Sequence, residues 1–347
     1  LIIFFFYNKM KSFIIIFLII IFIILIITSI HSEHKHNNRL KLKQFLYITD
    51  NIKPDYNHIQ NMVSNVNMYY INLNKTTDRN NYIQSQIQHL QLSNVYRIEG
   101  VYGRNVQNNS YTFSNGSKIF FKSEHHFSNP SELGCLLSHF VAIHTAYVNG
   151  DQYSIILEDD VYLNMIKIWK QSIQETIDNA PANWKIIQLY ESTMMPTNTS
   201  YISRSQQTHF STISYLINRE GMKIILDYID MKYDNSGNMY CNINKIKSYN
   251  KGWDYTADNY IYNIVRESVY TTNSKFISNN LFGNSNIKPR NIWEHYFDYT
   301  RDEAYILQSL NIVKNNYKEQ YQLSDIYNKR VLYVNIKNIP PPITNTK

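Results

Sequence analysis

The segment Ser154-Ile-Ile-Leu-Glu-Asp-Asp-Val161 decides the fold that we expect for this chain. A short aliphatic run, typical of a buried strand, ends in three consecutive acids, Glu158, Asp159 and Asp160. Like charges at the end of a buried strand repel one another, so we expect a cation to neutralise them. A divalent metal with oxygen ligands is the simplest candidate.

The segments before this strand alternate between strand and helix patterns. Residues 68–73 read as a strand, Ile83 and Ile87 recur at helical spacing after it, and residues 95–98 read as a second strand. This alternation predicts an α/β sheet. In open α/β sheets ligands bind at the carboxyl ends of the strands, which is where the three acids lie.

The rest of the chain continues the pattern. Further strands are expected at residues 152–157, 184–189 and 211–217, and helices at residues 166–177, after Gly221 and after Asp258; the regular pattern fades after Thr271. A polar loop is expected at about 99–128, and a polar insertion at about 233–250. Near the C-terminus we expect a helix over residues 301–315 and a short strand over residues 331–336.

A helix that begins after Asn129 carries two further candidate residues. Asn129 can cap this helix, Pro130 suits its first position, and Gly134 permits close packing. Cys135 and His139 lie four residues apart and so share one face. From these residues alone the plainer interpretation, a small core residue and a hydrogen-bonded histidine, is favoured.

The loop after the first strand delivers Thr76, Thr77 and Arg79 to the start of a helix. Free backbone N–H groups and an arginine can hold a phosphate there. The alternative is that Thr77 only caps the helix and that Arg79 is solvated.

Composition excludes several classes of protein. The formal net charge is +7, but Lys and Arg are scattered and no zinc-finger spacing occurs, so we do not expect nucleic-acid binding. Two cysteines cannot make a disulfide framework or a four-ligand zinc site. With 347 residues, one large domain plus extensions is expected.

The N-terminus contains an unbroken apolar run over residues 13–27, preceded by Met10, which we take as the natural start. We favour a signal anchor over a cleaved signal peptide, because Ile27 and Ile30 stand where cleavage needs small residues, although Thr28 and Ser29 leave cleavage open. Basic residues after the run favour a cytosolic body, whereas four Asn-x-Ser/Thr sequons favour the secretory lumen. We predict a single-pass membrane protein with its body in the lumen of the endoplasmic reticulum or Golgi.

Five segments together resemble glycosyltransferase family 25 in order and spacing. They are Tyr70-Ile-Asn-Leu73 with Asp78-Arg79, Arg97-Ile-Glu-Gly100, Ser131-Glu-Leu-Gly-Cys-Leu-Leu-Ser-His139, Ile155-Ile-Leu-Glu-Asp-Asp160 and Tyr215-Leu-Ile-Asn-Arg-Glu-Gly221. The family includes lipopolysaccharide-type sugar transferases and procollagen galactosyltransferases. The resemblance covers roughly residues 68–271, and its most specific part is the pair of acidic and Glu-Leu-Gly-Cys segments.

The resemblance implies a GT-A-type, Rossmann-like nucleotide-sugar transferase domain. It implies transfer of a hexose from a UDP-sugar to a hydroxyl group of a protein or glycan. Galactose and glucose are the hexoses that we favour. On this basis we divide the chain into an anchor at residues 1–31, a stem at 32–65, the transferase domain at 66–290 and an extension at 291–347.

The resemblance also implies roles for single residues. Glu158, Asp159 and Asp160 would hold Mn²⁺ or Mg²⁺, and our order of preference is Asp160, Glu158, Asp159. Asp258 would be the catalytic base of an inverting transfer. Among the remaining candidates, Thr77 and Arg79 would bind the donor, and His139 would support the site from behind.

Two departures from the family pattern leave other functions open. Relatives tend to read Asn-Leu-Asp-Arg where this chain has Asn72-Leu-Asn-Lys75, and Thr212-Ile-Ser-Tyr215 lacks the histidine of the usual Thr-His-Ala-Tyr. An inactive relative that binds a sugar or a partner is therefore the first alternative. A metal-dependent phosphodiesterase or glycosidase is the second, although no further acidic or histidine cluster accompanies Asp160 in the sequence.

Overall fold

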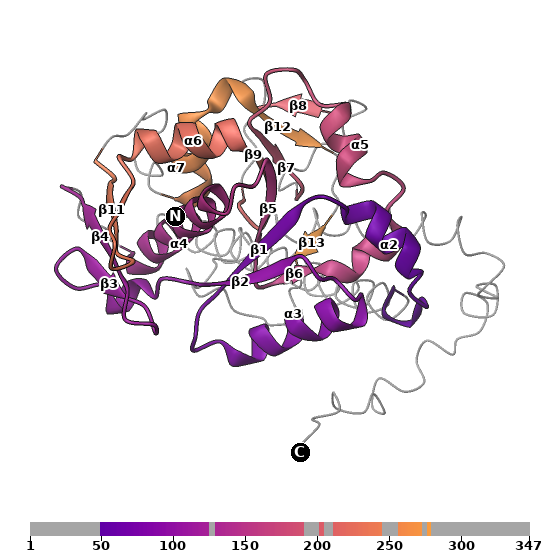
Figure 1. Cartoon of the computed structure of the whole chain (residues 1–347), viewed down its shortest axis with the longest axis horizontal. Helices are drawn as coiled ribbons and strands as arrows, with labels where there is room; N and C mark the ends of the chain where they lie inside the picture. Colours follow the sequence, from indigo (N-terminus) through magenta and orange to yellow (C-terminus); the bar gives the residue numbers. More distant parts are fainter. Residues whose placement is uncertain are drawn as a thin grey trace, which may run out of the picture.

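A seven-stranded mixed sheet forms the centre of the protein (Figure 1). The computed structural model describes residues 49–124, 129–190, 201–204, 211–244, 256–272 and 276–278. The strand order is β2-β1-β5-β9-β7-β12-β8. The strands are β1 (Asn67–Asn72), β2 (Val95–Glu99), β5 (Tyr153–Glu158), β7 (Ile186–Gln188), β8 (Tyr201–Ser203), β9 (Ser214–Asn218) and β12 (Val269–Thr272).

The direction of β9 determines what meets the acids. β2, β1 and β5 run parallel, whereas β9 is antiparallel to both β5 and β7. In this register Leu157 of β5 pairs with Ser214, the first residue of β9. The residues that precede β9 therefore lie beside the carboxyl end of β5, and the Glu158 N–H donates to the Ile213 carbonyl at 2.8 Å.

Helices cover both faces of the sheet (Figure 1). The helices α2 (Tyr56–Val63), α3 (Thr77–His89) and α5 (Ile173–Asp178) lie on one side, with the 3-10 helix η2 (Leu163–Ile168). On the other side lie α4 (Pro130–Val148), α6 (Arg219–Tyr228) and α7 (Ala257–Ile264). Along β1, Met68 and Tyr70 join the first of the two cores and Tyr69 the second, as the alternation of a strand buried on both faces requires. The expected α/β fold is confirmed.

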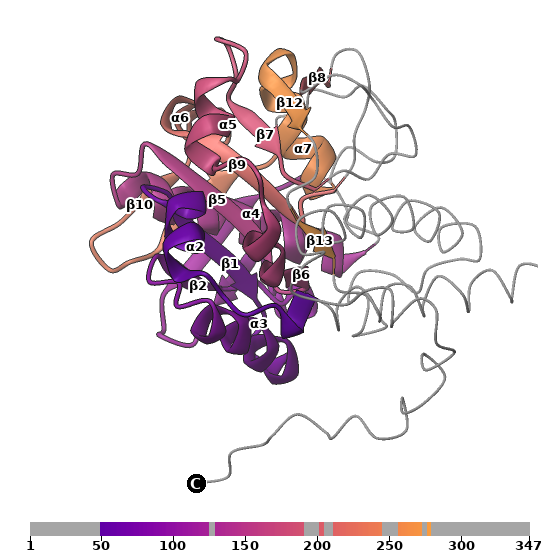
Figure 2. The ribbon, with the colours of Figure 1, turned by 90° about the vertical axis from the view of Figure 1, so that its right-hand side faces the viewer.

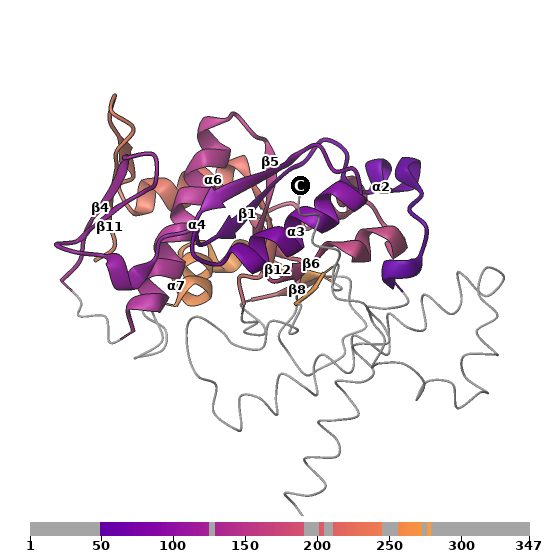
Figure 3. The ribbon, with the colours of Figure 1, turned by 90° about the horizontal axis from the view of Figure 1, so that it is seen from below.

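A four-stranded sheet, order β10-β11-β4-β3, forms one end of the molecule (Figure 3). It contains β3 (Ser110–Thr112), β4 (Lys118–Lys122), β10 (Lys232–Tyr233) and β11 (Met239–Asn242), and the 3-10 helix η1 (Gly103–Asn105) precedes it. The expectation of a loop at about 99–128 was therefore wrong where β3 and β4 form, and the polar insertion at about 233–250 contains β11. β4 finds its parallel partner β11 about 120 residues later, and neither strand has an apolar pattern strong enough to reveal it.

One expected helix is divided. Residues 166–177 do not form a single helix, because η2 ends at Ile168 and α5 begins only at Ile173. Ser172 caps α5 through a capping box with Glu175, and this local signal outweighs the continuous apolar spacing. Before η2, the short strand β6 (Val161–Tyr162) pairs with β13 (Ile277–Ser278), as Figure 2 shows; the remaining 3-10 helix is η3 (Arg266–Ser268).

Helix α2 belongs to the stretch that we expected to be a stem. Its Ile59 and Val63 are buried in the same core as Met68, together with Ile52 before the helix. None of the described helices is both long and apolar enough to cross a membrane. The apolar run at residues 13–27, the expected helix at 301–315 and the expected strand at 331–336 lie outside the described residues.

The first turn of α4 packs directly on the backbone after β2. A Cβ atom on Gly134 would lie 2.5 Å from the Val101 carbonyl oxygen, and one on Gly103 would lie 1.7 Å from the Pro130 carbonyl oxygen. The Val101 N–H also donates to Ser138 Oγ at 2.8 Å. Two glycines thus fix the position of α4, and with it Cys135 and His139, against the sheet.

Candidate active site

Glu158, the last residue of β5, lies between Thr212 and His139. Thr212 Oγ1 donates to its Oε1 at 2.9 Å, and His139 Nε2 lies 3.7 Å from the same oxygen. Burial raises the pKa of Glu158, but the neighbouring His139, the Thr212 hydroxyl and the positive charge of Arg79 outweigh burial and lower it overall. The carboxylate is therefore ionised, and its side chain keeps 26% of its surface exposed.

Asp159 turns in the opposite direction, toward β1 and α3. Its Oδ1 accepts from Arg79 Nη1 at 2.9 Å, and its Oδ2 accepts from Asn72 Nδ2 at 2.7 Å and from Thr76 Oγ1 at 3.3 Å. Burial lowers the pKa of Arg79, but Asp159, Asp160 and Glu158 together raise it. The guanidinium stays charged and compensates part of the acidic cluster.

Asp160 follows in the turn between β5 and β6. It is partly buried, and its charge acts on both Arg79 and Cys135. The side chains of Glu158 and Asp159 therefore point to different environments, Glu158 toward α4 and the start of β9 and Asp159 toward Arg79, while Asp160 stands in the turn.

Asp258, the second residue of α7, is joined to Glu158 by the segment before β9. Its Oδ2 accepts from the Ser211 N–H at 2.9 Å, and the next residue, Thr212, donates to Glu158. Ser211 has a φ of +96°, an unusual conformation for a residue other than glycine, and Tyr262 of α7 donates to its carbonyl oxygen at 2.9 Å. Two acids about 100 residues apart in sequence are thereby brought to one edge of the sheet.

Cys135 of α4 lies close enough to Glu158, Asp160 and Asp258 for their charges to act on its thiol. Burial and the charges of Glu158, Asp258 and Asp160 raise the pKa of its thiol well above the usual value. His139, one turn further along α4, is fully buried, and its Nδ1 lies 3.2 Å from the Tyr215 hydroxyl oxygen.

The structure brings together most of the predicted site residues but not Thr77. Thr77 is exposed at the start of α3, and the residue before it, Thr76, is the N-cap and the one that contacts Asp159. The alternative that Thr77 caps the helix and Arg79 is solvated was wrong, because Arg79 is only 13% exposed and is paired with Asp159.

Two contact residues were not predicted as site residues: Asn72 and Thr212. Asn72 carried a usable signal, since it is a polar residue at the end of a buried strand that runs parallel to β5. Thr212 lies in a family segment, but its contact with Glu158 depends on the antiparallel insertion of β9 between β5 and β7.

The carboxylates at the end of β5 fit a hard divalent cation. Their donor atoms are oxygens, which Mn²⁺ and Mg²⁺ prefer. Both oxygens of Asp159 already accept hydrogen bonds from protein groups. The order of preference among the three acids as metal ligands stays a prediction.

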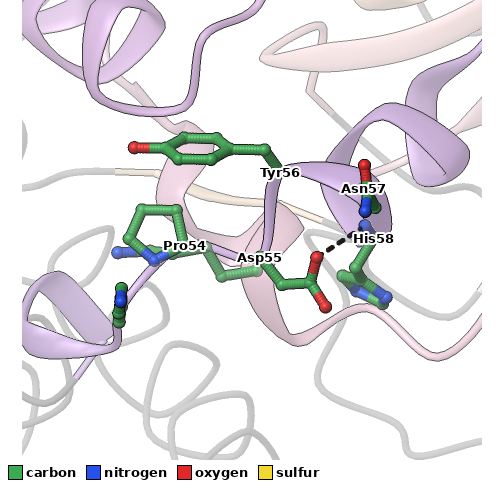
Figure 4. A pocket seen from close by; sticks show the side chains of 7 residues that line it. Pro54, Asp55, Tyr56, Asn57 and His58 are labelled. Carbon is green, nitrogen blue, oxygen red and sulfur yellow. Dashed lines mark hydrogen bonds between the residues drawn. The ribbon is translucent and has the colours of Figure 1, made fainter.

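A separate cavity of about 650 Å³ lies at the beginning of α2 and is lined by residues 53–58 and Lys167 (Figure 4). In it Asp55 caps α2 by accepting from the His58 N–H at 3.1 Å. Its lining includes none of the three acids at the end of β5, so the cavity does not belong to the candidate site.

Comparisons with known proteins agree with the arrangement of these segments. Residues 65–236 match the sequence model described as "Glycosyltransferase family 25 (LPS biosynthesis protein)". No curated protein matches the chain. The chain is also similar to the crystal structure of a glycosyltransferase involved in the glycosylation of the major capsid of PBCV-1, with 12% identity and a TM-score of 0.27, over 46% of this chain and 62% of that one. At this level the likeness says nothing about activity.

Proposed function

The chain belongs to glycosyltransferase family 25, whose model it matches over residues 65–236, and from this premise we propose that the chain transfers a hexose from a nucleoside-diphosphate sugar to a hydroxyl group of a protein or glycan. The observation that carries the proposal is the joining of Glu158 to Asp258 through Ser211 and Thr212. It supplies one acidic group for the leaving diphosphate and another for the incoming hydroxyl group.

The proposed metal pair is Glu158 and Asp160. Mn²⁺ or Mg²⁺ bound there would offset the negative charge that develops on the diphosphate as the sugar leaves. Asp159 acts differently: Arg79, Asn72 and Thr76 fix its orientation and so fix the turn that carries Asp160. In this proposal Arg79 is a positioning residue, while Thr77 at the start of α3 remains the candidate for the donor phosphates.

Asp258 is the proposed general base of an inverting, GT-A-type reaction. The acceptor hydroxyl oxygen forms a bond to the anomeric carbon, the bond from that carbon to the diphosphate oxygen breaks, and the hydroxyl proton passes to the Asp258 carboxylate. Attack and departure on opposite faces invert the anomeric configuration. The Ser211 N–H at 2.9 Å holds the carboxylate during this step.

UDP-galactose and UDP-glucose are the proposed donors. We further propose a luminal body behind a membrane anchor. Occupancy of the sequons at Asn74, Asn108, Asn115 and Asn198 in cells would support a luminal body, and four unmodified sequons would contradict it.

The test measures the release of nucleoside diphosphate by the full chain from a panel of nucleotide sugars with added Mn²⁺. Asp160→Asn should reduce release by about 100-fold or more, because it removes a charged ligand while keeping the shape of the side chain. Asp227→Asn, on the exposed face of α6, is the matched control and should leave release unchanged.

The other outcomes separate the alternatives. Equal release by wild type and Asp160→Asn would refute the assignment of the metal pair. Binding of nucleotide sugar without turnover would favour the inactive relative, and cleavage of a phosphodiester without nucleotide sugar would favour the hydrolase.

A further inference from the structure

Three side chains of different chemistry converge behind the acidic cluster. Cys135, His139 and Glu158 each offer one ligand atom, and these atoms lie within 4.8 Å of one another. Cys135 and His139 lie one turn apart on α4, and Glu158 ends the adjacent strand β5. The set therefore rests on two regular elements and not on a loop.

The ring nitrogen Nε2 of His139 is buried without a hydrogen-bond partner among the described residues, and this indicates a ligand. The His139 side chain is 1% exposed, and among the described residues no group lies within hydrogen-bonding distance of its Nε2. A buried ring nitrogen without a partner is costly. Nε2 faces Glu158 Oε1 at 3.7 Å, a distance too long for a hydrogen bond.

The other ring nitrogen is oriented as in metal-binding histidines. His139 Nδ1 lies 3.2 Å from the Tyr215 hydroxyl oxygen. If Nδ1–H donates to that oxygen, Nε2 carries the lone pair toward Cys135 and Glu158. An outer partner on the second nitrogen is the usual way in which proteins fix the tautomer of a metal-bound histidine.

We propose that Cys135, His139 and Glu158 bind a borderline-soft divalent metal of the Zn²⁺ type, with a fourth position left to solvent. Thiolate, imidazole and carboxylate are the three side-chain ligands of protein zinc sites, and three protein ligands with one open position are typical of sites that are not purely structural. Mn²⁺ and Mg²⁺ prefer all-oxygen ligands, so this set differs in ligand chemistry from the pair Glu158 and Asp160, with which it shares Glu158.

The distances allow the site to close with small side-chain movements. Ligands at 2.0–2.3 Å in a tetrahedron lie about 3.3–3.8 Å apart, and the Nε2 to Oε1 distance of 3.7 Å already falls in that range. Binding displaces the thiol proton of Cys135 to solvent, together with the Nε2 proton of His139 where the ring is the imidazolium that attracts Glu158. The partly exposed Cys135 and Glu158 provide the path of entry.

This inference goes beyond the proposed transfer reaction, and its test needs no nucleotide sugar. The metal-free full chain is titrated with Co²⁺, which reports a thiolate ligand through sulfur-to-cobalt charge-transfer absorption. One Co²⁺ per chain and a charge-transfer band that Zn²⁺ removes are expected. The chain contains two cysteines, so each can be tested separately.

The variants decide between the two thiols. Cys135→Ser should abolish the band and Cys241→Ser, in β11, should keep it. Tyr215→Phe should weaken cobalt affinity by roughly 10-fold or more, as expected for loss of an outer partner. A wild-type chain without the band, or a band that survives in Cys135→Ser with an unchanged circular dichroism spectrum, would overturn the proposal.

Discussion

The guanidinium of Arg79 holds the carboxylate of Asp159 at 2.9 Å, across 80 residues of sequence and with both side chains largely buried. The two residues therefore form one structural unit, in which loss of the Arg79 charge leaves the buried Asp159 without its cationic partner. This unit fixes the turn that presents Asp160.

Removing Arg79 should cost stability. Arg79→Ala leaves the buried Asp159 uncompensated, so we expect the free energy of unfolding in urea to fall by about 3 kcal/mol. Adding Asp159→Asn should restore part of this loss, since the uncompensated charge is then gone. Lys223→Ala breaks an exposed pair with Asp227 on α6 and should change nothing measurable. Equal effects of Arg79→Ala and Lys223→Ala would contradict a buried, coupled pair.

Removing the Thr212 hydroxyl should lower the stability of the folded protein by an amount that depends on pH. Glu158 has a lowered pKa, so its contribution to stability is present above the ordinary value of 4.5 and disappears as the pH falls through the lowered pKa. Thr212→Val should cost about 2 kcal/mol at neutral pH, as for a hydrogen bond to a charged group, and progressively less in acid. Thr212→Ser should behave as wild type. A pH-independent difference between Thr212→Val and wild type would show that Glu158 is not involved.

A buried lysine, Lys167, should make the free energy of unfolding depend on pH in the alkaline range. Burial lowers its pKa to about 8, against the attraction of Asp50, although its Nζ donates to the Ile52 carbonyl oxygen at 3.1 Å. Between pH 8 and the ordinary value of 10.5 the unfolded chain holds a proton that the folded chain has released, so folding becomes more favourable as the pH rises.

The comparison that isolates this effect is with Lys167→Met. The stability of wild type relative to Lys167→Met should rise by up to about 3 kcal/mol between pH 8 and 10.5, measured by urea unfolding at each pH. A difference that stays constant over this interval would mean that Lys167 keeps an ordinary pKa.

Because α4 packs closely on the backbone at Val101, stability should be unusually sensitive to substitution of Gly134. Gly134→Ala places a Cβ 2.5 Å from the Val101 carbonyl oxygen, so the backbone must move, and we expect a loss of about 3 kcal/mol. Gly100→Ala is the matched control, because its nearest neighbour is the flexible end of the Leu73 side chain at 3.1 Å. In thermal unfolding, Gly134→Ala should have a much lower melting temperature than Gly100→Ala. The reverse order of melting temperatures would refute the close contact.

The sequence was informative wherever a local pattern coincided with a tertiary role. The apolar run before Glu158 and the cap at Asn129 predicted β5 and α4, and both elements are present. The roles of the acids as metal ligands and of Asp258 as a base, which the resemblance implies, stay predictions. Local patterns could not give Thr212 its place, because only the antiparallel pairing of Leu157 with Ser214 creates it. The pairing of β4 with β11 was hidden for the same reason, since register between distant strands leaves no local trace.

The antiparallel insertion of β9 also affects the order in which the protein can be assembled. Three contacts of the site join residues that are synthesised far apart. Asp159 follows Arg79 by 80 residues, Thr212 follows Glu158 by 54, and Asp258 follows Ser211 by 47. A nascent chain that has reached Asp160 can pair β5 with β1, but its other edge stays open until β9 emerges from the ribosome. These long-range closures predict slow folding, with the open edge of β5 as the point at which unfinished chains are most exposed to mispairing.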